Sequence, residues 1–98
     1  MKHLTDKKYQ EFFKAILTLE NNEECRKFFE DVCTFKEMDA IVQRYMVAVM
    51  LNDKKSYTQI NESTGASSAT ISRVVRSLEN SEDGYKIVFE RLKKTDSN

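Results

Sequence analysis

Apolar residues recur at steps of three and four along almost the whole chain, which is the spacing of amphipathic helices. The first such segment begins near Thr5 and ends at Asn21, and the next one begins with Asn22 as its expected N-cap and Glu23 in its first turn. Proline is absent and only two glycines are present, so turn residues are too few for a β-sandwich. The pattern predicts an all-α fold.

The third segment, from about Lys36 to Asn52, differs because apolar side chains surround nearly its whole circumference. Ile41, Val42 and all of residues 45–51 are apolar. A helix of this kind has to be buried on every side. The other short helices of one chain cannot cover it completely, so the sequence predicts a homodimer in which a second copy supplies the rest.

Two shorter segments form a recognisable motif. A capping box of Ser56 and Gln59 begins a helix that Gly65 ends, and Ser67 can cap the helix that follows. Over residues 57–78, this has the spacing of a helix-turn-helix, whose second helix enters the DNA major groove. A plain helical hairpin has the same pattern, so a protein-interaction module that does not bind DNA is the alternative.

The second helix of this motif carries small polar residues outside its apolar stripe of Ile71 and Val74. Short side chains there let the helix approach base edges and thymine methyl groups closely. Two arginines farther along can reach phosphates or a guanine edge, and two lysines just before the motif can touch the DNA backbone. These candidate contacts are Ser68, Ala69, Thr70, Ser72, Arg73, Arg76, Lys54 and Lys55.

The last helical segment should be capped by Ser81 and should fray from Thr95 onward. Glu82 and Asp83 are expected in its first turn, where acidic side chains suit the helix dipole. Its expected buried stripe consists of Tyr85, Val88, Phe89 and Leu92.

No Pro-, Gly- or Ser-rich linker interrupts the chain, so we expect a single helical domain. The expected parts of this domain, residues 1–98, are dimerisation helices in 1–53, the helix-turn-helix in 56–79 and a C-terminal helix in 81–94.

Charge adds little to the DNA hypothesis. The chain has 16 basic and 16 acidic residues, so its formal net charge is zero. Only residues 54–81 are net positive, because their two lysines and two arginines outnumber Glu62 and Glu79. The hypothesis therefore depends on the motif, and non-specific DNA binding should be weak.

Other chemistry finds little support. His3 is the only histidine, and Cys25 and Cys33 are about 12 Å apart if they share a helix, so neither a metal site nor a disulfide is expected. We expect both thiols to be reduced and partly buried. The longest apolar run, residues 45–51, is too short to span a membrane, and no signal segment precedes it. These features predict a cytosolic protein that is not an enzyme and has no membrane partner.

Residues 64–78, TGASSATISRVVRSL, resemble the DNA-reading segment of the Trp repressor family, Gly-Ala-x-x-Ala-Thr-Ile-Thr-Arg-x-x-x-Ser-Leu. A weaker match includes Thr34 and the stretch from Glu37 to Arg44, and the whole chain is similar to the short YerC/YecD-type relatives of Gram-positive bacteria. The resemblance implies a six-helix, intertwined homodimer that binds a pseudo-palindromic double-stranded DNA operator. It implies a transcriptional repressor of amino-acid metabolism genes, and adds Thr58 and Asn61 to the candidate DNA contacts.

The resemblance also implies an amino-acid corepressor between Arg44 and Arg73, with Ser77 and Thr34 nearby. Val74 stands where the family has glycine, and a side chain there should intrude on the space of an indole ring. Tryptophan is therefore not the expected effector, and a smaller amino acid is conceivable. The alternative is that the two arginines simply bind phosphates or cap helices. No other cofactor is expected.

Overall fold

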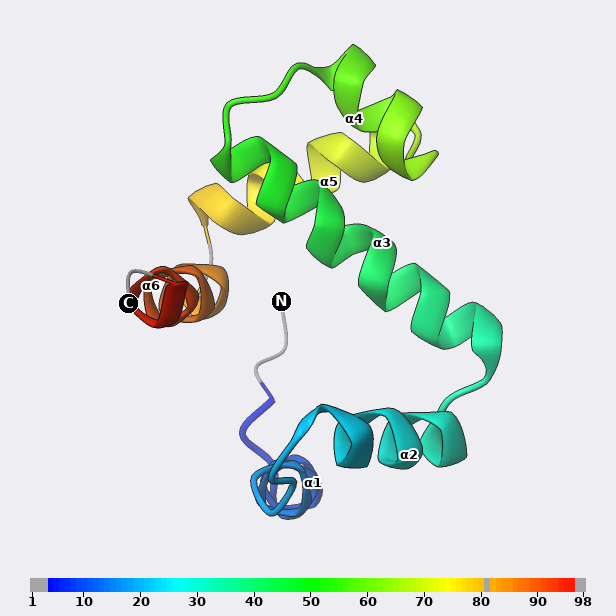
Figure 1. Ribbon diagram of the computed structural model, residues 1–98, viewed down its shortest axis with the longest axis vertical. Helices are drawn as coiled ribbons and strands as arrows, with labels where there is room; N and C mark the ends of the chain where they lie inside the picture. Colours follow the sequence, from blue (N-terminus) through cyan, green and yellow to red (C-terminus); the bar gives the residue numbers. More distant parts are fainter. Residues whose placement is uncertain (1–3, 81, 97–98) are drawn as a thin grey trace. The chain divides into compact units, whose positions relative to one another are not determined.

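The computed structural model describes residues 4–80 and 82–96, which form six helices and no strand (Figure 1). This confirms the predicted all-α fold. The chain divides into two compact units, one up to Met38 and one from Asp39 onward. The helices are α1 Lys7–Ile16, α2 Asn22–Val32, α3 Phe35–Asn52, α4 Tyr57–Thr64, α5 Ser68–Glu79 and α6 Gly84–Asp96.

The first unit begins with α1, and Asn21 caps the start of α2. Its backbone is extended, and its side-chain oxygen accepts the amide hydrogen of Glu24 at 2.9 Å. The prediction that Asn22 is the cap was therefore wrong. Asn22 is already helical, so only the preceding asparagine has the extended backbone that turns a side chain toward the third amide of the helix.

Aromatic rings connect the two helices of the first unit. The ring centroids of Phe12 and Phe28 lie 5.9 Å apart, and Phe28 meets Phe29 edge to face at 5.4 Å. No residue of α1 or α2 is buried, however, and Leu17 and Phe35 are 82% and 85% exposed. One copy of this unit therefore leaves several large apolar side chains in contact with water.

The two cysteines are free thiols. Cys33 is half-buried, as expected, but Cys25 is exposed, so the expectation of partial burial was wrong for Cys25.

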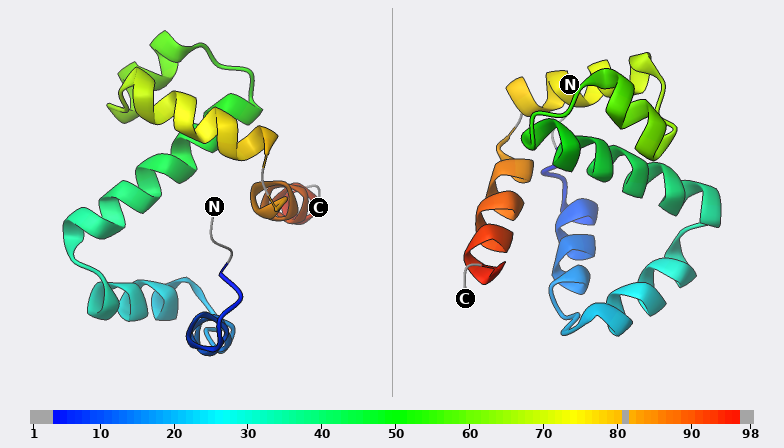
Figure 2. Two further views of the ribbon diagram at one scale, coloured as in Figure 1. Left: turned by 180° about the vertical axis from the view of Figure 1, so that it is seen from behind. Right: turned by 45° about the horizontal axis from the view of Figure 1, so that its top comes forward.

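The second unit has a closed core. Six apolar residues from α3, α4, the following turn and α5 are at most 2% exposed. Both views of Figure 2 show α5 lying across the C-terminal end of α3. Tyr85 and Phe89 of α6 pack against this core. The core residues are Val47, Ala48, Ile60, Ala66, Ile71 and Val74.

Helix α3 is covered on one side only within its unit. Val47 and Ala48 are fully buried, whereas Ile41, Val42 and Met46 are 45%, 42% and 42% exposed. This incomplete cover is what the sequence predicted for one copy. The second copy that would complete it remains a prediction.

Helix α6 differs from its prediction at both ends. It begins at Gly84, so Glu82 and Asp83 precede the helix, and Asp83 has a φ of 65° while its carbonyl accepts the amide hydrogen of Ile87 at 3.0 Å. The proposed cap, Ser81, lies outside the described residues. Thr95, which was expected beyond the ordered helix, is helical, and its hydroxyl donates to the Arg91 carbonyl at 3.1 Å.

The expected buried stripe of α6 was only half right. Tyr85 and Phe89 are partly buried, but Val88 and Leu92 are 43% and 47% exposed. The apolar stripe of α6 is wider than the surface of α3 and α5 against which it packs, so part of the stripe stays exposed.

Candidate nucleic-acid interface

The helix-turn-helix begins with the predicted capping box. Ser56 Oγ accepts the Gln59 amide hydrogen at 3.2 Å, and Gln59 Oε1 accepts the Ser56 amide hydrogen at 2.9 Å. The two side chains thus satisfy two amides that the helix itself leaves unpaired. Both ends of α4, Tyr57 and Thr64, match the prediction.

The turn between α4 and α5 is fixed by several hydrogen bonds. Gly65 adopts a left-handed φ of 74° and donates to the Asn61 carbonyl at 2.8 Å. The Thr64 hydroxyl donates to the Ile60 carbonyl at 2.8 Å and accepts the Ala66 amide hydrogen at 3.1 Å. Asn61 Nδ2 donates to the Ala66 carbonyl at 2.9 Å. These bonds define the direction in which α5 leaves the turn.

Asn61 therefore has a structural role that its sequence position did not indicate. Its side-chain nitrogen, Nδ2, donates the hydrogen bond to the Ala66 carbonyl that stabilises the turn, although the residue as a whole is exposed. The contact between Asn61 and DNA stays a prediction, as does that of the exposed Thr58 on the same helix.

Helix α5 presents a small, polar outer face. Ser67 caps it by accepting the Thr70 amide hydrogen, and its hydroxyl also donates to Thr70 Oγ1, both at 3.2 Å. Ile71 and Val74 point into the core, and no large apolar residue within 67–77 is exposed. This face does not favour an apolar protein-docking surface. Its predicted contacts Ser68, Ala69, Arg73 and Arg76 are exposed, and Thr70 and Ser72 are half-buried.

Tyr57 joins this surface and was missed by sequence reasoning. Its hydroxyl lies 3.5 Å from Ser72 Oγ, which links the first residue of α4 to α5, and its ring is 43% exposed. The only sequence signal was an aromatic residue directly after an N-cap and outside the apolar stripe.

Lys54 and Lys55 lie in the turn that ends α3. Their amides donate to the carbonyls of Leu51 and Met50, both at 3.0 Å, in the pattern that usually places glycine at the left-handed position. Lys54 occupies that position with a φ of 64°. Both lysines are exposed just before the helix-turn-helix.

A small cavity brings Arg44 of α3 together with Arg73 of α5. Its volume is about 130 Å³, and Gln43 on its wall donates to the Thr64 carbonyl at 3.0 Å, which joins α3 to the end of α4. Both arginines of the predicted effector site therefore line one space. The full lining is Ala40, Gln43, Arg44, Thr70 and Arg73.

The other two predicted effector residues do not line this cavity. Ser77 is half-buried farther along α5, and Thr34 belongs to the first unit. Thr34 caps α3: its hydroxyl accepts the Glu37 amide hydrogen at 3.2 Å, and its amide donates to Glu37 Oε1 at 2.8 Å. The hydrogen bond from the Thr34 backbone amide, and secondly one from the Thr34 side chain, lower the pKa of the Glu37 carboxyl. Val74 faces the core, so its effect on an indole stays a prediction.

Within residues 4–80 and 82–96, no helix is long and apolar enough to cross a membrane. The same residues contain no group of three or more His, Cys, Asp or Glu side chains that could hold a metal ion.

Comparisons with known proteins agree with this architecture. The sequence profile of the Trp repressor protein family matches residues 7–93. The uncharacterized protein YerC of Bacillus subtilis is 43% identical over 94 residues, which cover 96% of this chain and 90% of YerC.

Two crystal structures have the same fold. A TrpR-like protein from Eubacterium eligens is 50% identical, with a TM-score of 0.88 over 92% of this chain and 93% of its own. A candidate Trp repressor from Staphylococcus aureus is 46% identical, with a TM-score of 0.87 over 92% and 90% of the two chains. The chain therefore belongs to the Trp repressor family.

Proposed function

We propose that this protein is a homodimeric, sequence-specific DNA-binding regulator that places α5 in the major groove. The observation that carries the proposal is the construction of α5. Its apolar side closes a core, its N-terminus follows a hydrogen-bonded turn, and its exposed side chains from Ser68 to Arg76 are small or basic. This combination suits a helix that must approach base edges closely.

In this proposal the small residues contact the bases, and the basic residues contact mainly the DNA backbone. Ser68, Ala69, Thr70 and Ser72 approach the bases, while Arg73 reaches a phosphate or a guanine edge. Lys54, Lys55 and Arg76 contact the DNA backbone. Because the chain has no net charge, the affinity for random DNA is low, and discrimination among sequences depends on the helix itself.

The homodimer explains the incomplete cover of the helices. Apolar side chains are exposed in α1, α3 and α6 of one copy, among them Phe12, Ile41 and Ile87. A second copy can bury this surface, and its α5 would then read a half-site about 34–36 Å away. The expected operator is a pseudo-palindrome.

An effector site between Arg44 and Arg73 is part of the proposal. Two guanidinium groups favour a carboxylate. The cavity has a volume of about 130 Å³ and is open to solvent. The proposed ligand is an amino acid smaller than tryptophan, on the argument from Val74. The regulated genes would then be those of amino-acid metabolism, with repression as the mode, in the cytosol.

The test is selection from the protein's own genome. Purified protein is mixed with sheared genomic DNA at about 0.15 M salt, with and without pooled amino acids, and the retained DNA is sequenced. We expect a few promoter sites that share a two-fold-related motif, and a difference between the two conditions if an effector exists.

Two variants complete the test. Arg73→Met should abolish the enrichment, whereas Arg91→Met, on the exposed surface of α6, should preserve it. If the wild-type protein enriches no site in either condition, the DNA proposal is wrong and the protein-interaction module is favoured.

A further inference from the structure

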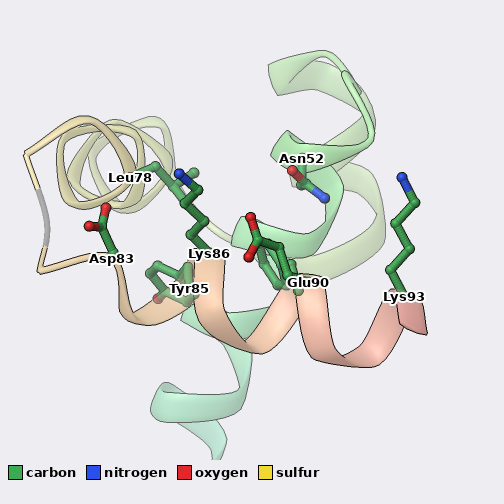
Figure 3. Close-up of a pocket in the computed structure, with 8 residues that line it drawn as sticks. Asn52, Leu78, Asp83, Tyr85, Lys86, Glu90 and Lys93 are labelled. Atoms are coloured by element: carbon green, nitrogen blue, oxygen red, sulfur yellow. The ribbon is translucent and has the colours of Figure 1, made fainter. Parts of the chain in front are cut away.

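A larger cavity lies where α6 meets the C-terminal ends of α3 and α5 (Figure 3). Its volume is about 340 Å³, within the range of about 300–1,000 Å³ that is typical of small-molecule sites. The cavity at Arg44 and Arg73 is less than half this size. Its lining residues are Asn52, Leu78, Asp83, Tyr85, Lys86, Phe89, Glu90 and Lys93.

The apolar part of the lining consists of three half-buried side chains, Leu78, Tyr85 and Phe89. The rings of Tyr85 and Phe89 stack with their centroids 5.9 Å apart and their planes at 25°. Phe89 also packs against Tyr45 of α3 at 6.1 Å, which holds its ring in place. Such a surface can accept a flat or branched apolar group.

The polar part of the lining carries both signs of charge. Lys86, Glu90 and Lys93 are spaced four and three residues apart, so they share one face of α6. In Figure 3 they rise from α6 on the side where Asn52 lies. A simple anion would meet the carboxylates of Asp83 and Glu90, and a simple cation would meet the ammonium groups of Lys86 and Lys93. The arrangement suits a ligand that carries both charges.

We propose that this cavity binds a small zwitterion with an apolar or aromatic group. Its ammonium group pairs with Glu90, its carboxylate pairs with Lys86, and its apolar part lies on Tyr85 and Phe89. Leu78 belongs to the last turn of α5, so the ligand touches the end of the proposed recognition helix. Binding at this site does not depend on the proposed function, because it requires no DNA.

The experiment is a calorimetric and NMR titration of the full chain with phenylalanine, the simplest probe that has both charges and an aromatic group. Two controls separate the contributions. N-acetylphenylalanine amide lacks both charges, and alanine lacks the aromatic group. We expect phenylalanine to bind more tightly than either, with chemical-shift changes centred on Tyr85 and Phe89.

Variants locate the site. Removing one charged partner in Lys86→Met or Glu90→Gln should weaken phenylalanine binding about two- to fivefold, because both groups are exposed. Arg91→Met, a charge deletion elsewhere on α6, should leave it unchanged. Arg44→Met removes a charge from the smaller cavity and tests whether phenylalanine binds there instead.

Three results would overturn the inference. They are no binding of phenylalanine, equal binding of its uncharged analogue, and a loss of binding in Arg44→Met while Lys86→Met binds normally. The last result would assign the ligand to the arginine pair instead. All of these readouts are independent of whether the protein selects DNA.

Discussion

The two compact units of this chain differ in how completely they bury their apolar side chains. The unit from Asp39 onward closes a core of six residues at most 2% exposed, whereas α1 and α2 of the first unit bury none. Aromatic rings in the first unit touch each other but stay in contact with water. The difference indicates that the helix-turn-helix is stabilised within one chain, while the apolar side chains of the first unit are left for the proposed second copy to cover.

The largest effect is expected from a truncation in the closed core. Ile71→Ala should cost about 2–5 kcal/mol, because it removes a buried side chain that its neighbours cannot fully replace. Urea denaturation followed by circular dichroism measures this loss. Ala69→Gly, on the exposed face of the same helix, serves as a control and should cost about 1 kcal/mol. Equal costs for both variants would contradict the distinction between core and surface.

The next effect tests the open unit. Phe35 is 85% exposed in one copy, so Phe35→Ser should barely change a protein that works as a monomer. If a second copy covers this ring, the variant loses about 1.5–3 kcal/mol of association energy. Sedimentation equilibrium at several protein concentrations should therefore show a weaker dimer. An unchanged dimer, with Lys36→Ser as the matched control, would show that Phe35 lies outside the interface.

A pair of turn substitutions should give smaller and opposite effects. Gly65→Ala should destabilise the protein by about 1–2 kcal/mol, because alanine is strained at a φ of 74°. Nothing lies within 4 Å of the added methyl group, so the cost comes from the backbone alone. Lys54→Gly, at a φ of 64°, should stabilise by up to about 1 kcal/mol.

DNA binding makes this pair more informative. The melting temperature should fall in Gly65→Ala and rise in Lys54→Gly, but both variants should bind the operator less tightly. Gly65→Ala disturbs the turn that orients α5, and Lys54→Gly removes a proposed phosphate contact, which should reduce the salt slope of log K by about one. If Lys54→Gly kept full affinity and the full salt slope, that contact would be excluded.

The smallest effect concerns pH and the start of α3. Hydrogen bonds from Thr34 lower the pKa of Glu37 below its ordinary value of 4.5 in the folded state. A lowered carboxyl pKa stabilises the fold above the unfolded value, and this contribution is lost as the pH falls through the folded value. The wild-type protein should therefore lose stability relative to Glu37→Gln as the pH drops below 4.5. Parallel melting curves for the two proteins would contradict this assignment.

The sequence was most successful in predicting helix ends, caps and turns, which depend on residues close together in the chain. The start of α3 was placed within one residue of Phe35, and the cap at Ser67 and the turn at Gly65 were correct, because each depends on a few adjacent residues. Asn21 and Asn22 could not be separated, since both are good caps and only the backbone decides between them.

Contacts between distant segments were harder to anticipate. The pairing of Tyr57 with Ser72 and the cavity beside α6 depend on how helices cross, which periodicity does not specify. The approach of Arg44 to Arg73 was indicated by family resemblance alone. Val88 and Leu92 were assigned to the core because an apolar stripe does not show how much of it one chain can cover.

The turn after α4 also has a consequence for how such proteins diversify. Asn61, Thr64 and Gly65 orient α5 through backbone carbonyls and amides, and none of these bonds involves the outward side chains of Ser68, Ala69 or Arg73. A gene that encodes this scaffold can therefore accumulate changes on the outer face without loss of folding. Under the proposed function, duplicated copies can acquire different operators by a few point mutations, while the geometry that presents α5 is inherited intact.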